Sequence, residues 1–463
     1  MELGTRSALG LIATLALISG CGGGGGGGSS TSGSTTAPST TPPSTTPPST
    51  TPPSTTPPPP SPPVPPASSA IPIDHVFIIF KENHTFDNYF GSYPGANGVM
   101  SAKTSTGATV PLTQFTDELN VPGSNGWDSA HGDYDGGLMD RFDLNEGQPI
   151  FSLLSFLDSG PFQTYAPANG QPGGPIKYYW QIAQQGTLCD NYFTSVMGCS
   201  SPNHMFSFAA QCGNLISNEN LSTHQWTVLD ANGNQVQHPN HFTVQEVPTT
   251  IANELEAKGL TWKYFAESQG FGIVGQLITS LEDNDASVSG LDVVAALPDF
   301  KQRYDDQTAT LDTNLAALLA SGQVGNVTYI KPAPFACEHP GVGPVGFGCD
   351  WTRKVVNEIG NSQYWNHCAI LITFDDYGGF YDHVAPPQLD KLGLGFRVPC
   401  IIVSPYAKKG FVDHTQYEHA SLCKFSEKVF GLPAMSTRDA ASADMTDAFD
   451  FTQQPRSFAD FHF

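Results

Sequence analysis

The stretch His75-Val76-Phe77-Ile78-Ile79-Phe80, which continues through Lys81 into Glu82-Asn83, decides the fold. An unbroken run of β-branched and aromatic residues is typical of a strand that is buried on both faces, as in a parallel sheet. Three further runs have the same character: 327–330, 369–374 and 398–403. We therefore expect these four runs to form buried parallel strands.

The segments between these runs have the spacing of helices that pack on a sheet. This spacing is found in Thr250–Lys258, Leu311–Ala320 and Trp351–Ile359. Residues 73–463 contain no second linker, so we expect one domain. The pattern predicts an α/β domain with a largely parallel central sheet covered by helices on both faces.

Two of the predicted strands end in acidic or amide pairs. The first runs into Glu82-Asn83, and the strand that ends at Phe374 runs into Asp375-Asp376. Ligands of open α/β sheets bind outside the carboxyl ends of the strands, so neighbouring strands would bring these four side chains together. A single such pair is usually a solvated turn or a helix cap. Two pairs favour a site for a hard divalent cation, with Ca²⁺, Mg²⁺ or Mn²⁺ preferred over Zn²⁺.

The segment Gly198-Cys199-Ser200-Ser201-Pro202-Asn203-His204 predicts the start of a helix, because Pro is favoured in a first helical turn. Free N–H groups and the positive dipole end would suit a phosphate and an ionised serine oxygen. In the alternative interpretation Ser201 is only an N-cap and Ser200 a loop residue. His131, His339, His383 and His419 each have an acidic neighbour within three residues, which could orient or charge the ring, and the pattern does not choose among them.

The N-terminal residues predict export. Arg6 precedes the apolar stretch Ala8–Ile18, which is too short to span a bilayer and is typical of a signal peptide. Ile18–Cys21 resembles the bacterial lipobox, so residues 1–21 are expected to be a lipoprotein signal whose Cys21 is acylated; an ordinary signal peptide with an incidental cysteine is the alternative. Residues 22–72, rich in Gly, Thr, Pro and Ser, predict a disordered stalk. We expect a protein anchored by lipid in the cell envelope, facing outside the cytoplasm.

The charge of the chain limits its partners. The formal net charge is −23, and the stalk carries no charged residue, so the excess lies in the domain. Nucleic acid is therefore not expected as a partner. An acidic domain can still bind phosphate when cations are held locally.

Nine cysteines are present, and eight of them lie beyond Cys21. An even number in an exported domain predicts disulfides. The pairs that close locally in the chain are Cys337 with Cys349 and Cys199 with Cys212.

Several blocks resemble a known family in the same order. Lys81–Gly91 is similar to its E-N-R-S-F-D-x-x-F-G signature, Leu188–Phe193 with Gly198–His204 to its D-x-Y-F and G-x-T-x-P-N-R stretch, and Thr373–Val384 to its T-x-D-[DE]-x-G-G-x-Y-D-H-V block. Shorter matches follow at 397–399, 404–406 and 417–421. These blocks resemble the bacterial phosphoesterase family, which groups phospholipases C with a metal-dependent acid phosphatase.

The resemblance implies an alkaline-phosphatase-like fold in which a Ser or Thr attacks phosphorus beside bound metal. Carried over by position, Ser200 is the nucleophile, and Glu82, Asn83, Asp375 and Asp376 hold the cation. The remaining candidates are His131, His339 and His383 as catalytic residues and Asn203 and His204 as substrate-binding residues. His84 and His204 stand where the family usually has Arg.

The expected function is that of a metal-dependent phosphoesterase acting on small phosphate monoesters or diesters. The alternatives are a phospholipase C acting on phospholipids and a non-catalytic envelope binding module of the same fold. The chain ends at Phe463 and so lacks the C-terminal extension of long phospholipase C members, which weakens the expectation of lipid specificity.

Overall fold

The computed structural model describes most of the predicted domain. The described residues are 71–115, 122–145, 160–218, 220, 223, 225–239, 242–266 and 311–461. The predicted signal peptide, Cys21 and nearly all of the stalk lie outside them. Within the described residues, no helix is both long and apolar enough to cross a membrane.

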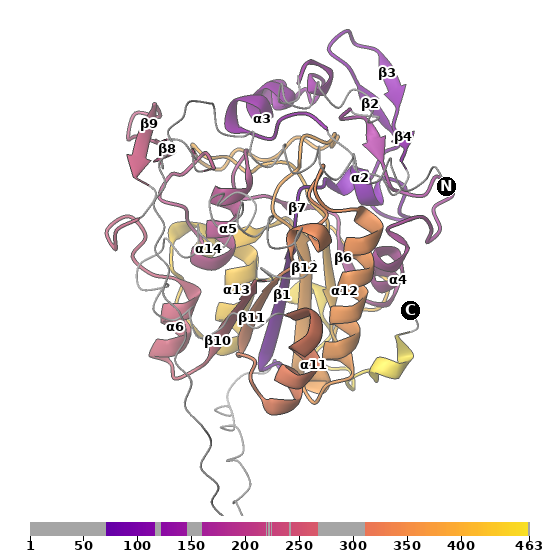
Figure 1. Ribbon diagram of the computed structural model, residues 1–463, viewed down its shortest axis with the longest axis vertical. Helices are drawn as coiled ribbons and strands as arrows, with labels where there is room; N and C mark the ends of the chain where they lie inside the picture. Colours follow the sequence, from indigo (N-terminus) through magenta and orange to yellow (C-terminus); the bar gives the residue numbers. More distant parts are fainter. Residues whose placement is uncertain are drawn as a thin grey trace, which may run out of the picture.

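A seven-stranded sheet forms the centre of the domain (Figure 1). Its strands, in spatial order, are β10 (Trp262–Ala266), β11 (Val327–Lys331), β1 (His75–Lys81), β12 (Cys368–Phe374), β13 (Cys400–Val403), β6 (Thr187–Cys189) and β14 (Phe411–Asp413). All residues of β11, β12 and β13 are buried, as expected of apolar strands covered on both faces. The four strands predicted from the sequence are therefore confirmed as strands.

The direction of β13 differs from the prediction. It pairs antiparallel with β12 on one side and with β6 on the other, whereas the remaining neighbours in the sheet are parallel. A parallel connection needs a crossover, usually a helix, but residues 375–399 contain no helix. The chain therefore enters β13 at the edge where β12 ended. A run of apolar residues shows that a strand is buried, but it does not show whether the strand is parallel or antiparallel to its neighbours.

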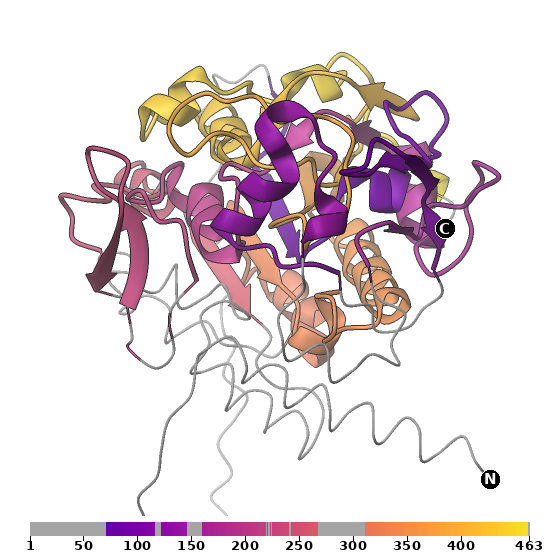
Figure 2. The ribbon, with the colours of Figure 1, turned by 90° about the horizontal axis from the view of Figure 1, so that it is seen from above.

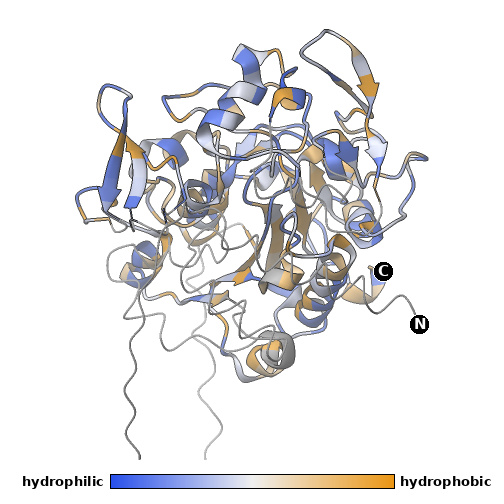
Figure 3. Ribbon diagram, turned by 45° about the horizontal axis from the view of Figure 1, so that its top comes forward, coloured by the Kyte–Doolittle hydropathy of each residue, from blue (hydrophilic) through white to orange (hydrophobic). Residues whose placement is uncertain are grey.

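Helices cover both faces of the sheet, as predicted. One face carries α4 (Lys177–Gln185), α11 (Leu311–Ser321) and α12 (Val345–Gly360), and the other carries α5 (Ser200–Ala209), α6 (Ile251–Ala257), α13 (His419–Phe430) and α14 (Thr437–Ala441) (Figures 1 and 2). The predicted helix 351–359 is the second half of α12. Hydrophobic residues gather on the strands, while the outer sides of the helices are largely polar (Figure 3). This is the layered α/β architecture that the sequence predicts.

Short elements close the carboxyl edge of the sheet. The principal ones are α2 (Phe86–Phe90), α3 (Trp127–Tyr134) and the hairpin of β2 (Ser101–Lys103) with β3 (Thr109–Pro111). A second, smaller hydrophobic core joins α3 and the hairpin to the loop after β12, whereas α2 packs in the main core: Ala102, Leu112, Ala130, Met139, Phe142, Met197, Tyr377, Tyr381 and Phe396 form the second core. Other short strands are β4 (Thr113–Gln114), β5 (Gln163–Thr164), β7 (Tyr192–Phe193), β8 (Gln225–Leu229), β9 (Gln235–Pro239) and β15 (Tyr417–Glu418). The short 3₁₀ helices are η2 (Asp135–Gly137), η3 (Phe142–Leu144), η5 (Pro334–Ala336), η6 (Trp365–His367), η7 (Thr446–Ala448) and η8 (Phe458–Asp460).

The cysteines do not pair as predicted. All eight cysteines of the described residues are buried thiols, so neither Cys337–Cys349 nor Cys199–Cys212 is a disulfide in the structure. The sulfur of Cys199 lies 3.7 Å from the Ile216 carbonyl, and that of Cys212 lies 3.5 Å from the Leu215 carbonyl. The sulfurs of Cys199 and Cys212 thus contact backbone carbonyls and not each other. Closeness of two cysteines along the chain did not predict a disulfide between them.

Candidate active site

The register of the two central strands brings the predicted cation ligands together. β1 and β12 pair from His75 opposite Cys368 to Lys81 opposite Phe374, so Glu82 and Asp375 leave the sheet side by side. The Asp375 N–H donates to the Lys81 carbonyl at 3.0 Å and extends this pairing by one step. Two strands far apart in sequence thus deliver their terminal polar residues to one point.

The Asn83 side chain bridges the two carboxylates. One terminal atom of its amide lies 2.8 Å from Glu82 Oε2 and 2.9 Å from Asp375 Oδ1. As nitrogen, this atom donates to both carboxylates; as oxygen, it would add a third oxygen donor facing a cation. Asn83 also has a φ of 54°, a left-handed conformation that Asn tolerates better than most residues, and its N–H donates to Asp375 Oδ1 at 3.0 Å.

A tight turn holds Asp376 beside this group. Gly378 donates its N–H to Asp376 Oδ1 at 2.7 Å. A Cβ at Gly378 would lie 2.3 Å from the Asn83 carbonyl oxygen, and its φ is 64°, so only glycine fits here. The turn after β12 therefore packs directly against the turn after β1.

Ser200 lies next to Asp376. It is the first residue of α5, and its hydroxyl donates to Asp376 Oδ2 at 3.0 Å. The N-cap residue is Cys199, so Ser201 is not the N-cap, contrary to the alternative interpretation. The Ser201 hydroxyl is buried and has no hydrogen-bond partner in the described structure. Of the two serines, Ser200 is therefore the one in contact with a carboxylate of the site.

Two residues of the site were missed by the sequence reasoning. Asn125 donates to both carboxylate oxygens of Asp376, at 3.0 and 2.9 Å. Lys331, the last residue of β11, forms a buried ion pair with Glu82. Lys331 follows the same rule that identified Glu82 and Asp375, a charged residue ending an apolar strand. Asn125 carries no such signal, since it lies in a polar loop.

His204 lies among the carboxylates. Its Nε2 is 3.6 Å from Glu82 Oε1 and 3.5 Å from Asp375 Oδ2, and Lys331 Nζ is 3.4 Å from the same nitrogen. His204 follows Ser200 by one helical turn, so both side chains face the site from α5. The residue predicted to bind substrate thus belongs to a group of three possible cation ligands, with Glu82 and Asp375.

The site contains more buried negative than positive charge. The carboxylates of Glu82, Asp375 and Asp376 are fully buried, while Lys331 supplies a single ammonium group. Burial raises the pKa of Asp376 far above its usual value, and the neighbouring Asp375 raises it further. Burial would also raise the pKa of Asp375, but the contacts with His204 and Lys331 lower it instead. Converging buried oxygens with excess negative charge fit a hard divalent cation.

Two predicted catalytic histidines share one feature of hydrogen bonding. His131 Nδ1 lies 2.7 Å from the Trp127 carbonyl, and His339 Nδ1 lies 2.8 Å from the Pro340 carbonyl. An Nδ1–H that donates to a carbonyl leaves Nε2 as the acceptor of a neutral ring. Burial lowers the pKa of His131, which favours the neutral form. The loop that precedes the α3 helix of His131 also contains Asn125, which contacts Asp376.

Asn203, also predicted to bind substrate, is engaged with the backbone. Its Oδ1 accepts from the Val196 N–H at 2.9 Å, and its Nδ2 donates to the carbonyls of Val196 and Cys199 at 3.2 and 3.0 Å. Asn203 therefore shapes the loop that leads to Ser200.

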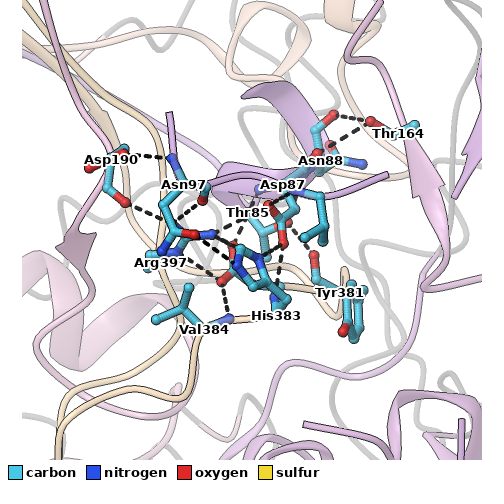
Figure 4. Close-up of polar contacts among 12 residues, drawn as sticks. Thr85, Asp87, Asn88, Asn97, Thr164, Asp190, Tyr381, His383, Val384 and Arg397 are labelled. Carbon is cyan, nitrogen blue, oxygen red and sulfur yellow. Dashed lines mark hydrogen bonds and ion pairs between the residues drawn. The ribbon is translucent and has the colours of Figure 1, made fainter. Parts of the chain in front are cut away.

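His383 belongs to a separate group, the Arg397 cluster, which consists of Asp87, Asp382, His383 and Arg397 (Figure 4). Arg397 donates to Asp382 through Nε at 2.9 Å and Nη2 at 3.1 Å, and it contacts Asp87 at 3.3 Å. His383 Nδ1 lies 2.6 Å from Asp87 Oδ2, and its Nε2 lies 3.2 Å from Asn97 Oδ1. Both ring nitrogens of His383 are thus engaged in holding the loop after β12.

The two other histidines near the site are neutral and structural. His84 lies 2.9 Å from both the Glu338 carbonyl and Asn88 Oδ1, and burial lowers its pKa to about 3. His419 Nε2 lies 2.8 Å from the Asp375 carbonyl, and burial lowers its pKa to about 4. At the positions where the family usually has Arg, this chain therefore has a buried neutral ring at His84 and a neighbour of the cation ligands at His204.

The Ser200 hydroxyl lies beside buried carboxylates at the carboxyl edge of the sheet, and comparisons with known proteins identify the class of protein to which the chain belongs. The chain belongs to the Phosphoesterase family, whose family model matches residues 73–433. It is a hydrolase that acts on phosphoric ester bonds.

The curated relatives are named as phospholipases C. Phospholipase C B of Mycobacterium tuberculosis is 26% identical over 454 residues, covering 83% of this chain and 78% of that protein. Non-hemolytic phospholipase C of Pseudomonas aeruginosa is 26% identical, covering 82% of this chain and 57% of that protein. A solved alkaline phosphatase superfamily protein from Vibrio parahaemolyticus covers 75% of this chain and 72% of its own, at 11% identity with a TM-score of 0.34. A similarity at this TM-score does not support transferring any property of that protein to this chain.

Proposed function

We propose that this chain is an exported, lipid-anchored phosphoesterase in which Ser200 attacks phosphorus beside a divalent cation held by Glu82, Asn83, Asp375 and Asp376. The observation that carries the proposal is the 3.0 Å hydrogen bond from the Ser200 hydroxyl to Asp376 at the start of α5. Placed there, the hydroxyl has a proton acceptor on one side and the N-terminal N–H groups of a helix on the other.

The protein groups around Ser200 have distinct roles. Asp376 holds the Ser200 hydroxyl through the 3.0 Å hydrogen bond, and in its ionised form, which a bound cation would favour, it can take the hydroxyl proton as the Oγ–P bond forms. Asn125 and Gly378 hold the carboxylate in this orientation. When bound, the cation neutralises negative charge that develops on the phosphoryl oxygens. Lys331 contributes a fixed positive charge to the same end of the sheet.

Breaking the ester bond requires a proton for the leaving oxygen. His131 and His339 are the candidates: in each ring Nδ1 contacts a backbone carbonyl, and the ring in its doubly protonated form would give the Nε2 proton to the leaving oxygen. Water then hydrolyses the phosphoserine and releases the phosphate product.

The substrate is a phosphate monoester or diester, and a phospholipid is the second candidate. The names of the relatives favour the phospholipid. Against a simple transfer of their specificity, both ring nitrogens of His84 lie 2.9 Å from protein oxygens, and an imidazole offers no guanidinium fork to phosphate. Rates of hydrolysis of a simple phosphomonoester and of phosphatidylcholine would separate the two. A phosphatidylcholine rate that exceeds the monoester rate would favour the phospholipase C assignment.

Export and anchoring rest on the N-terminal sequence, Arg6 with Ala8–Ile18 and the lipobox-like Ile18–Cys21. A Cys21→Ser chain should leave the membrane fraction. If it fractionated with membranes as fully as the original chain, acyl anchoring would be wrong.

Replacement of each serine in turn tests the nucleophile. Ser200→Ala should fold normally and lose nearly all turnover. Ser201→Ala is the matched control: it removes a buried hydroxyl that has no partner, so it should remain active and at least as stable as the original. An inactive Ser201→Ala with an active Ser200→Ala would reverse the assignment. If both variants stayed active, a serine nucleophile would be excluded.

A further inference from the structure

A second group of possible metal ligands lies at the opposite edge of the sheet. Asp74 immediately precedes β1, His75 begins it, and His367 immediately precedes β12. One atom of the Asp74 carboxylate, Oδ1, contacts both rings: His75 Nδ1 at 2.7 Å, and His367 Nδ1 in a short contact. The three ligand atoms lie within 4.8 Å of one another. Side-chain exposure is 28% for Asp74, 16% for His75 and 38% for His367, so solvent reaches the group.

The other two acidic clusters of the described residues each contain a lysine or an arginine that pairs with the carboxylates. Lys331 pairs with Glu82, and Arg397 pairs with Asp87 and Asp382. Among the described residues, the Asp74 carboxylate contacts two imidazoles and neither a lysine nor an arginine. Two imidazoles that converge on one carboxylate can exchange their shared protons for a metal ion.

We propose that Asp74, His75 and His367 bind a transition cation of the Zn²⁺ type, at a site separate from the catalytic one. Two imidazole nitrogens and a carboxylate oxygen suit Zn²⁺, whereas the oxygen-rich catalytic group suits harder cations. Zinc ligands at about 2 Å from the ion lie roughly 3.3 Å from each other in a tetrahedron. To reach this spacing, the contact of Asp74 with His75 needs to open by about 0.6 Å and the short contact with His367 by more, which rotation of partly exposed side chains allows. Water completes the coordination.

The position of the site indicates a structural role. The Asp74 N–H donates to the His367 carbonyl at 3.0 Å, one step before the His75 and Cys368 pair of the β1–β12 ladder. Both strands contain seven residues, so the two cation sites lie about 20 Å apart at opposite ends of the same central strands. A metal ion here links the starts of two strands that belong to distant parts of the chain.

Zinc stoichiometry, measured on the full chain in excess Mg²⁺, tests the proposal. Removal of one imidazole in His367→Ala should lower the number of tightly bound Zn²⁺ ions by one per chain and weaken that site more than about 100-fold. Asp74→Asn, which preserves the shape of the side chain, is the second variant and should give the same loss. His238→Ala is the matched control, because His238 pairs with Glu246 at 2.7 Å and no third possible ligand among the described residues joins this pair.

Activity and melting temperature separate this site from the catalytic one. Both variants should retain phosphoester turnover without zinc, and zinc should raise the melting temperature of the original chain and of His238→Ala only. An unchanged zinc count in folded His367→Ala and Asp74→Asn would overturn the proposal. So would the same loss of zinc in His238→Ala.

Discussion

The candidate active site and the Arg397 cluster are built from the same residue types. Both lie at the carboxyl edge, and both join the segment after β1 to the loop after β12: Glu82 with Asp375 and Asp376 in one, Asp87 with Asp382 in the other. Each also contains a histidine. Their difference is in charge balance: Arg397 makes a two-pronged contact with Asp382, whereas Lys331, through Glu82, is the one lysine or arginine of the described residues in an ion pair with the three carboxylates of the active site.

Residue identity therefore does not separate a reactive site from a structural one in this molecule. A guanidinium that donates two parallel hydrogen bonds to a carboxylate balances its negative charge, so that carboxylate needs no further cation. The active site retains unsatisfied negative charge, which destabilises the domain and makes it ready to bind a cation. Four substitutions test whether charge balance is the property that distinguishes the two groups.

The largest expected effect is on turnover in Asp375→Asn. Loss of one carboxylate from the active site should remove the bound cation and lower turnover by at least about 10⁴-fold, or roughly 5 kcal/mol. Metal content and phosphoester hydrolysis should fall together. Asp382→Asn is the matched control, and its metal content should equal that of the original chain. Normal turnover in a metal-free Asp375→Asn would refute the role of the site.

Arg397→Met should have the largest effect on stability. It leaves Asp87 and Asp382 buried without their main counter-ion, so the free energy of unfolding should fall by about 3–5 kcal/mol. Denaturant unfolding with and without divalent cations would measure this. If added cations restored the original stability, the Arg397 cluster would be a cation site in its own right, and the contrast between the two groups would fail.

Asp376→Asn should change stability in the opposite direction. Burial and Asp375 raise the pKa of Asp376, so its ionised form is disfavoured in the folded chain at neutral pH. In the presence of a chelator this variant should be about 1 kcal/mol more stable than the original, although less active. A less stable Asp376→Asn under these conditions would show that the active site has no excess of negative charge.

The smallest effect concerns pH. Burial alone would lower the pKa of His383, but its hydrogen bond with Asp87 raises it above 6.5. The charged ring therefore stabilises the folded state below this value, and the contribution is lost as the pH rises through the raised pKa. In His383→Gln, the difference in melting temperature between about pH 6 and about pH 9 should become smaller. If the difference stayed as large in His383→Gln as in the original chain, the charged ring of His383 would not be its cause.

The sequence predicted the strands because burial leaves a direct trace in residue type, and it predicted the meeting of their polar ends on the condition that the strands are neighbours. The direction of β13 left no such trace, since Ile401 and Ile402 are buried in either orientation. Lys331 was missed because the predicted strand ended one residue early, at Ile330. Asn125 depends on a contact with Asp376 across 251 residues, which no local pattern reports. No local pattern shows either that Asp382 is paired with an arginine while Asp375 is not, because this difference also depends on contacts between distant parts of the chain.

The pairing of β1 with β12 has a consequence for folding. The hydrogen bond between Asn83 and Asp375 closes a separation of 292 residues, and the sheet places β1 between two strands from the second half of the chain. Such high contact order makes folding slow, because a long loop must close before the contacts form. While β12 is still unsynthesised or unfolded, Glu82 and Asn83 have no partner strand to complete the site. Hydrolytic activity should consequently appear as one of the last events of folding, after the whole sheet has assembled.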